Sequence, residues 1–212
     1  MTGVQTCALP ISAGAACMKA SLEKGEVVTL PHVNTIADGT AVQTPGSHIF
    51  PYIQENLDEI ITVEDDELIV AFLDMVENHK MIVENSGLLT VAALRHLDFK
   101  NKKVVSILSG GNMDVITMSS VVQHGLIQRD RIFTVSVLIP DKPGELVRVA
   151  SIIAENQGNV IKLDHNQFVS TNRNAAVELK ITLEAFGTDH KNQIVKALET
   201  AGCRPKVIRA SL

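Results

Sequence analysis

The sequence has no tryptophan and one tyrosine among its 212 residues, and its formal net charge is −5. So few large aromatic side chains argue against a stacking platform for nucleic-acid bases. No stretch is rich in lysine and arginine, so the electrostatic footprint of a nucleic-acid-binding protein is also missing. No apolar run approaches the roughly 20 residues that a membrane-spanning helix needs. These absences exclude nucleic acid and membrane as expected partners.

Cysteine is scarce as well, with three residues at Cys7, Cys17 and Cys203 that form no closely spaced pair. An odd, scattered set predicts reduced thiols and a cytoplasmic location. No group of His, Cys, Asp and Glu has the spacing of metal ligands, so the sequence predicts no metal site. His79 and His165 are interpreted as ordinary surface or strand-edge histidines.

What the sequence does contain is enough apolar residues for a core. It is 45% hydrophobic and 20% charged, which is typical of a globular protein and not of a disordered or fibrous one. The length permits one large domain or two small ones.

The stretch from residue 104 to residue 112 (VVSILSGGN) is the most informative one in the chain. Residues 104–108 are apolar apart from one serine and predict a buried parallel strand. The Ser-Gly-Gly turn at 109–111 follows, and Asn112 can cap a helix predicted over 113–124. Open α/β sheets bind ligands at such turns, and glycines allow a flat or anionic ligand to approach the backbone. A plain connecting turn is the alternative.

Residues 1–13 differ from the rest, since they carry no charged side chain and show no helical or strand period. A secretory signal needs an early basic region, but the first lysine is Lys19, and Pro10 interrupts the apolar stretch. We interpret residues 1–13 as a non-native string and expect them to be poorly packed.

Between residue 14 and the Ser-Gly-Gly turn, the pattern predicts several helices and one strand. Helices are expected over residues 15–23, 52–57 and 86–97, and a strand over 59–63. A further helix has an apolar face at 3.6-residue period, and Thr62 with Asp65 has the spacing of a capping box at its start. The residues expected on that apolar face are Leu68, Ile69, Phe72, Leu73 and Val76.

After residue 130 the pattern changes to alternating strands. Strands are predicted over residues 133–137, 160–168, 177–183 and 206–208, and helices follow the turns at 140–145 and 187–188. The order β-α-β-β-α-β is that of the ferredoxin-like split unit. The predicted division is therefore 1–13 for the string, 14–129 for an α/β domain and 130–212 for a second domain.

Residues 14–212 resemble the C-terminal portion of threonine dehydratase (threonine ammonia-lyase), a pyridoxal-phosphate enzyme of fold type II. The likeness is carried by residues 35–39 (TIADG) with Pro45-Gly46, residues 83–87 (VENSG) and residues 104–114. The final domain resembles an ACT domain through residues 141–146 (DKPGEL). The resemblance implies a partial fold type II (tryptophan synthase beta-like) α/β domain followed by a ferredoxin-like βαββαβ ACT domain.

The same resemblance implies cofactor-binding residues. The hydroxyl of Ser109 would meet the pyridine nitrogen of pyridoxal phosphate, and Gly110 and Gly111 would let the ring lie against the backbone. A neutral hydroxyl does not force that nitrogen to be protonated. The cofactor ring is then a weaker electron sink, but one that is adequate for the loss of a β-hydroxyl group from the substrate. Glu84 matches a glutamate near the cofactor, with an acidic helix start as the alternative. Asp38 belongs to the TIADG motif, or is only a turn residue.

Two family features do not occur in this sequence. The Schiff-base lysine and the glycine-rich phosphate loop lie upstream of the matching part, and Lys19 and Lys24 stand in the wrong context to replace that lysine. The glutamate with which some relatives bind a divalent cation would fall near Ala13. We therefore expect no catalytic residue and no metal site in this chain, which should be inactive alone. The resemblance does not imply that it binds the cofactor by itself.

For the second domain, the resemblance implies side-by-side pairing into a homo-oligomer and binding of small amino acids at the interface. Isoleucine and valine are the expected effectors. The free N–H groups after Gly144 suit a carboxylate, although Pro143-Gly144 is also explained as a tight turn. The implied ligand residues are Asp141, Gly144, Glu145, Leu146, Asn159 and Val160.

Three functional interpretations stay open at this point. The first is a fragment of an enzyme that converts L-threonine to 2-oxobutanoate and ammonia, in isoleucine biosynthesis or in threonine catabolism. The second is a non-catalytic, ACT-type amino-acid-binding regulator. The third is a fragment of a serine dehydratase or racemase.

Overall fold

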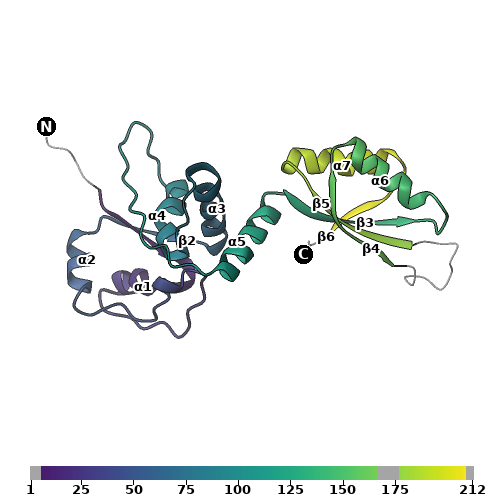
Figure 1. The fold of residues 1–212 in the computed structure, drawn as a ribbon. Helices are drawn as coiled ribbons and strands as arrows, with labels where there is room; N and C mark the ends of the chain where they lie inside the picture. Colours follow the sequence, from purple (N-terminus) through teal and green to yellow (C-terminus); the bar gives the residue numbers. More distant parts are fainter. Residues whose placement is uncertain (1–5, 167–176, 209–212) are drawn as a thin grey trace. The chain divides into compact units, whose positions relative to one another are not determined.

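The computed structural model describes residues 6–166 and 177–208, and these form a mixed α/β protein (Figure 1). The chain divides into two compact units, residues 1–122 and 123–212. This division falls inside helix α5 (Val115–Gln128), seven residues before the boundary that the sequence predicted at Asp130.

The first unit combines two short strands with helices. Its 3-10 and π turns comprise Ala13–Ala15, Asp38–Thr40, Met75–His79, Asn85–Leu88 and Ala93–His96. Its regular elements are β1 (Ala8–Ser12), α1 (Cys17–Lys24), α2 (Phe50–Asn56), β2 (Glu59–Val63), α3 (Asp65–Asp74), α4 (Leu89–Ala92) and the start of α5.

Strands β1 and β2 pair in parallel, with Ala8 opposite Glu59 and Ser12 opposite Val63. Ser12 is buried, and its hydroxyl donates to Thr35 Oγ1 at 2.7 Å. The expectation that residues 1–13 are poorly packed is therefore wrong for β1, because the strand is paired along its length. Residues 1–5 lie outside the described residues, and a foreign origin of the string stays a prediction.

Helix α3 contributes the main apolar surface of the first core. Its predicted face is confirmed at Leu68, Ile69, Phe72 and Leu73, which are all buried, whereas Val76 is only partly buried. The predicted capping box is wrong by two residues. The N–H of Glu64 donates to Glu67 Oε2 at 2.9 Å, so these glutamates and not Thr62 and Asp65 close the first turn.

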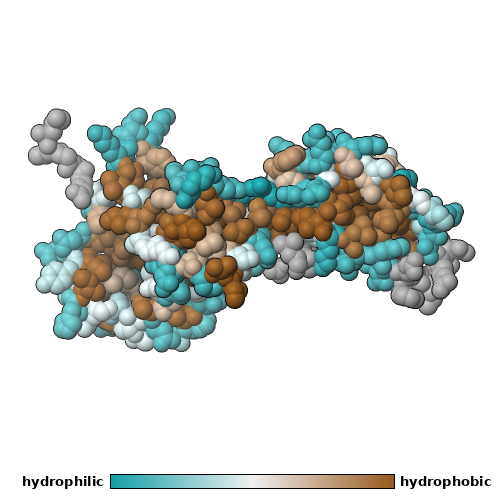
Figure 2. All heavy atoms as spheres, viewed as in Figure 1, coloured by the Kyte–Doolittle hydropathy of each residue, from teal (hydrophilic) through white to brown (hydrophobic). Residues whose placement is uncertain are grey.

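Residues 104–108 do not form the buried strand that the sequence predicted. They have no regular secondary structure, and the side chains of Val105 and Ile107 are 89% and 73% exposed. Within the described residues of the first unit, β1 and β2 form a two-stranded sheet, and neither pairs with 104–108. An apolar run becomes a strand only where a neighbouring strand accepts its backbone hydrogen bonds. Figure 2 shows hydrophobic side chains on the surface of this unit.

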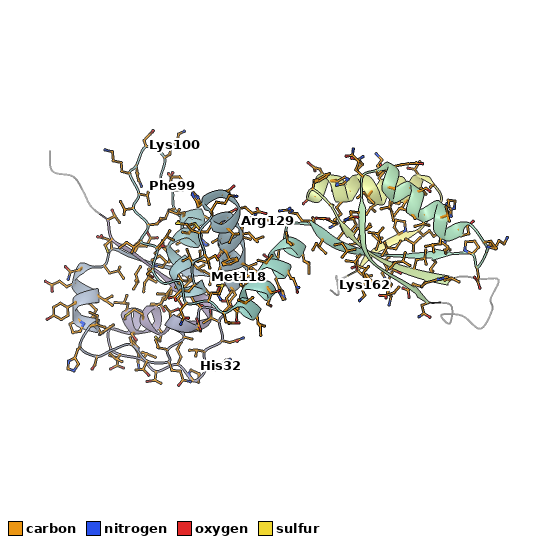
Figure 3. All side chains as sticks on the ribbon, viewed as in Figure 1. His32, Phe99, Lys100, Met118, Arg129 and Lys162 are labelled. Carbon is orange, nitrogen blue, oxygen red and sulfur yellow. The ribbon has the colours of Figure 1, made fainter. Side chains whose placement is uncertain are left out.

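The two helices predicted around this stretch also differ in detail. Asn112 is not the cap of α5, because Asp114 Oδ1 accepts from the N–H groups of Ile116 and Thr117, each at 2.9 Å. The helix predicted over 86–97 is instead a chain of short turns around the four-residue α4. Met118 of α5, labelled in Figure 3, packs against the first core.

The second unit has the element order that the sequence predicted. The strand order is β4-β5-β3-β6, with antiparallel neighbours, and two helices accompany the sheet (Figure 1). The predicted end of the second strand at Phe168 lies outside the described residues. The elements are β3 (Ile132–Ile139), α6 (Glu145–Glu155), β4 (Asn159–Asn166), β5 (Val177–Glu184), α7 (Thr188–Thr200) and β6 (Pro205–Ile208).

The second core lies on one face of this sheet. Alternate residues of β3 and β5 are buried, as the period-2 pattern predicted, together with Val149 and Ile153 of α6 and Ile194 and Leu198 of α7. On the other face, Thr134 Oγ1 and Thr182 Oγ1 are 2.9 Å apart, so these buried hydroxyls satisfy each other.

The segment between α5 and β3 is tied to α7 through Asp130, whose backbone has a φ of 54°. Asp130 Oδ1 accepts from Lys191 Nζ at 2.7 Å, and Oδ2 accepts from the hydroxyl of Thr188 at 2.9 Å. Burial by itself raises the pKa of Asp130, but the hydrogen bonds and the charge of Lys191 outweigh it, so the pKa lies below its usual value.

This pair predicts acid sensitivity in the second unit. A carboxyl whose pKa is lowered by folding stabilises the folded state above its unfolded pKa, and this contribution is lost as the pH falls through the folded pKa. We expect Lys191→Met to cost about 1–2 kcal/mol at neutral pH and less in acid. Urea unfolding at several pH values measures this. Lys162→Met, which removes an exposed pair at 3.8 Å, is the control; equal losses in both variants contradict the prediction.

Within residues 6–166 and 177–208, no helix has both the length and the apolar character needed to cross a membrane. Cys7 is exposed and Cys17 and Cys203 are buried, and all three are free thiols. Burial raises the pKa of the Cys17 thiol.

Candidate functional site

The Ser-Gly-Gly turn is exposed and is held by the segment that begins at Glu84. Gly110 has a φ of 77°, a left-handed conformation that favours glycine. The N–H of Glu84 donates to the carbonyl of Gly110 at 3.4 Å, and Glu84 Oε2 accepts from the N–H of Asn112 at 3.3 Å. A Cβ on Gly110 would lie 2.1 Å from the Glu84 carboxyl group. Glycine is therefore required at this position, although no strand precedes the turn.

The residues after Glu84 lie in direct contact with the backbone of the Ser-Gly-Gly turn. A Cβ on Gly87 would lie 1.7 Å from the carbonyl oxygen of Ser109, so these two backbones are in direct contact. The hydroxyl of Thr90 donates to the carbonyl of Ile107 at 2.9 Å. The segment from Glu84 to Thr90 thus holds residues 107–109 in place, although no neighbouring strand pairs with them.

The TIADG motif lies at the same site and is fixed by an aspartate from α3. Asp65 accepts from the hydroxyl of Thr35 at 2.6 Å and from the N–H of Ile36 at 3.0 Å. The amide of Asn85 donates to the carbonyl of Ile36 at 2.9 Å. Asp38 accepts from the N–H of Gly39 at 2.9 Å, as a turn residue does. The structure therefore joins residues 35–39 to residues 83–87.

Between these segments and the start of α5 lies a pocket of about 420 Å³. Its charged lining residues within the described chain are Asp38, Glu84 and Asp114, and no lysine or arginine is among its lining residues. Hydrogen bonds from Thr117, first from its hydroxyl and then from its N–H, hold the pKa of Asp114 below its usual value. The pocket is acidic and is not suited to a phosphate group.

Three residues of this site were not singled out from the sequence. Asp65 was assigned to a capping box, Asp114 was part of the matching stretch 104–114 and of the predicted helix, and Asn85 was only part of the VENSG motif. Asn85 is 4% exposed, and its Oδ1 has no hydrogen-bond partner among the described residues. Asp114 could have been predicted as the cap of α5, because aspartate is a common first residue before a helix. The contact of Asp65 with Thr35 had no signal in the sequence.

The arrangement fits part of what pyridoxal phosphate requires. Ser109 is exposed beside two glycines and has a hydroxyl for the ring nitrogen, and Glu84 holds that turn in place. Ser109, Gly110 and Gly111 are not among the lining residues of the pocket, to which Glu84 and Asn112 contribute. No lysine lines the pocket within the described chain, so no amine lies there to form a Schiff base. The residues present therefore offer a hydroxyl at the turn and no covalent anchor in the pocket.

The residues of the predicted amino-acid site lie at two opposite ends of the sheet in the second unit. Gly144, with a φ of 92°, precedes α6, and Glu145 in its first turn accepts from Arg148 at 2.8 Å. This hydrogen bond raises the pKa of Arg148. Asp141 is exposed in the loop before α6, and Leu146 is exposed in the first turn of α6.

Asn159 and Val160 begin β4 at the opposite end of the sheet. Asn159 and Ile132 both pair with Glu184, so the start of β4 aligns with the start of β3. The loop at residues 141–146 follows the far end of β3, roughly 23 Å along the strand at about 3.3 Å per residue. Within one chain, the two halves of the predicted ligand site are therefore not brought together.

No group of His, Cys, Asp and Glu in the described ranges is arranged to hold a metal ion. The first unit is thus an α/β unit with a glycine turn, an exposed serine hydroxyl and a supporting glutamate.

Comparison with known proteins identifies the family. The family model described as pyridoxal-phosphate dependent enzyme matches residues 1–110, so the chain belongs to that family. The predicted resemblance to these enzymes and the family's cofactor, pyridoxal phosphate, are thereby confirmed. The match includes residues 1–13 and ends at Gly110 in the Ser-Gly-Gly turn.

Individual relatives agree with this assignment. The chain is similar to an L-threonine ammonia-lyase of Geobacter sulfurreducens, with 35% identity over 98% of this chain and 50% of the relative. It is also similar to an L-threonine ammonia-lyase of Thermotoga maritima, with 31% identity over 97% of this chain and 50% of the relative. Maize serine racemase has a similar structure, with a TM-score of 0.50 and 31% identity over 56% of this chain and 40% of that one. The chain spans about half the length of the two ammonia-lyases.

Proposed function

We propose that this chain is the C-terminal part of a threonine ammonia-lyase that converts L-threonine to 2-oxobutanoate and ammonia. The observation that supports this most directly is the turn bearing Ser109, which Glu84 holds through both its backbone and its carboxylate. The sequences most like it over nearly its whole length include two L-threonine ammonia-lyases. On this proposal, residues 14–129 belong to the catalytic domain and residues 130–212 form a regulatory ACT domain.

In the proposed enzyme, the bound cofactor supplies the electron sink for elimination. Ser109 would bind its ring nitrogen through a hydroxyl, and Gly111 would give close access to the backbone. Gly110 would give the turn its left-handed conformation. Glu84 would orient the turn, because its carboxylate accepts from the Asn112 N–H and covers Gly110. None of these residues moves the substrate proton.

By itself, this polypeptide should not release ammonia from threonine. The pocket beside the turn has three carboxylates and, among the described residues, no lysine, so no amine is placed to bind the cofactor covalently there. Pyridoxal phosphate added to the chain should therefore produce no absorbance band of covalently bound cofactor.

For the second unit we propose binding of a small amino acid, with isoleucine and valine as the effectors to test first. A two-fold pairing of two chains along the exposed edge strand β4 would run the two β4 strands antiparallel. The start of β4 in one chain would then lie at the same end as residues 141–146 of the other. The separation of the two half-sites within one chain is the feature that favours such a homodimer.

Calorimetric titration of the chain with isoleucine, valine and threonine, with and without pyridoxal phosphate, tests both parts. We expect binding of at least one effector that is independent of the cofactor, no ammonia and no band of covalently bound cofactor. Ammonia release, or that band, contradicts the proposed incompleteness of the catalytic site. Failure of all three amino acids to bind contradicts the regulatory domain.

Two other functions are alternatives. A non-catalytic amino-acid-binding regulator is favoured if the second unit binds an effector and added pyridoxal phosphate does not bind to the chain, because residues 130–212 would then act alone. A fragment of a serine dehydratase or racemase is favoured by the similarity to maize serine racemase, which covers 56% of this chain. An isoleucine-biosynthetic role requires inhibition of the complete enzyme by isoleucine.

A further inference from the structure

The first turn of α7 contains a histidine whose two ring nitrogens contact the backbone of two different loops. His190 Nδ1 accepts from the N–H of Phe186 at 3.0 Å, and Nε2 lies 2.7 Å from the carbonyl oxygen of Asn156. A backbone N–H can only donate and a carbonyl can only accept. The two contacts therefore define one tautomer, with the proton on Nε2 and none on Nδ1.

Further contacts fix the ring and the loop. The imidazole stacks on the ring of Phe186, with centroids 4.8 Å apart and planes 17° from parallel. Gln193, one turn later in α7, donates to Asn156 Oδ1 at 3.3 Å. Helix α7 thus binds Asn156, the residue that ends α6, through both its carbonyl and its side chain.

Asn156 begins the short connection into β4. Gln157 has a φ of 60°, and a Cβ on Gly158 would lie 2.8 Å from Ile153 Cγ2, so this connection is packed directly against α6. Asn159 follows and donates to Glu184 at 3.0 Å. With so few residues between Asn156 and β4, the contacts of Asn156 determine where β4 begins.

We propose that His190 is a pH-dependent latch on the connection between α6 and β4, and that amino-acid binding at Asn159 and Val160, which begin β4, weakens in acid. A proton on Nδ1 would face the Phe186 N–H, so this hydrogen bond is lost and two donors repel each other. Turning the ring relieves this repulsion at the expense of its stacking and its contact with Asn156. This inference rests on the proposed amino-acid site.

The charged residues on the neighbouring elements are Asp189 and Lys191 on α7, Glu155 at the end of α6 and Glu184 at the end of β5. Lys191 is paired with Asp130 at 2.7 Å. The switching element is therefore the imidazole itself, whose neutral form alone satisfies the Phe186 N–H.

Hydrogen exchange of the whole chain tests the latch without any ligand. After correction for intrinsic rates, we expect residues 153–160 to exchange about tenfold faster at about pH 5.5 than at about pH 7.5, the effect of losing about one hydrogen bond. His190→Gln should remove this pH dependence, and His165→Gln, which replaces an exposed histidine of β4, should keep it. An unchanged pH dependence in His190→Gln overturns the proposal.

Two other measurements keep the test decisive if His190→Gln does not fold. Nitrogen-15 NMR of the unaltered chain should show His190 protonated on Nε2 alone at neutral pH; a proton on Nδ1 overturns the latch. Calorimetry with isoleucine and valine at both pH values should show about tenfold weaker binding in acid. Equal affinities at both pH values overturn the latch, whereas no binding at either pH contradicts the proposed amino-acid site and leaves the exchange result to decide the latch.

Discussion

Phe72→Ala should unfold the first unit at denaturant concentrations that leave the second unit intact. Phe72 is completely buried in α3, within the cluster formed by β2, α3, α4 and part of α5. Removing a buried phenyl group costs the lost transfer free energy and leaves a cavity, together about 3–5 kcal/mol. The second unit has its own cluster of buried residues and should keep its stability.

Urea unfolding followed by circular dichroism, with hydrogen exchange to assign each transition, measures this effect. Tyr52→Ala is the matched control, because this aromatic side chain of α2 is 66% exposed and its removal should change the free energy of unfolding little. A loss of protection in β5 equal to that in α3 would show that the two units unfold together, contrary to the expectation.

Gly87→Ala should displace the turn that carries Ser109. The new methyl group would lie 1.7 Å from the Ser109 carbonyl oxygen and 2.9 Å from Val83 Cγ1, and a backbone oxygen cannot move without moving the turn. Overpacking of this kind costs about 1–3 kcal/mol, and here it also breaks the contact between Glu84 and Gly110. Hydrogen exchange at residues 107–112 should rise accordingly.

Gly111→Ala provides the comparison within the same turn. A Cβ there would have the carbonyl oxygen of Ile82 as its nearest neighbour, at 3.7 Å, which is an ordinary contact. The free energy of unfolding and the exchange at residues 107–112 should therefore change little. If both glycine variants respond alike, the close approach of Gly87 to Ser109 is not what holds the turn.

The acidic pocket and the second unit depend on different parts of the chain, so their tests are independent. Substitutions at Glu84 or Gly87 act on the turn that carries Ser109, whereas substitutions at Lys191 and His190 act within residues 123–212. A variant that alters amino-acid binding without altering the Ser109 turn would locate the effect in the second unit.

Local patterns of the sequence determined most of the second unit. The alternation in β3 and β5 places one face of each strand in the core, and the helical period of α6 and α7 places Val149, Ile153, Ile194 and Leu198 opposite it. Each of these patterns is formed by residues only a few positions apart along the chain. They can therefore be predicted from the sequence without knowledge of the tertiary structure. The Ser-Gly-Gly turn and the glutamate of VENSG were likewise visible as motifs.

Tertiary contacts decided the rest, because they join residues that the sequence separates. Residues 104–108 have the composition of a buried strand, yet they are exposed where the described first unit has no strand beside them. Residues 8–12 have no pattern of a strand, yet they form one because β2 offers a parallel partner. The same holds for the link between Asp65 and Thr35 and for the latch between His190 and Asn156. Composition sets what a segment can become, and the partner that the fold supplies for its backbone hydrogen bonds decides what it becomes.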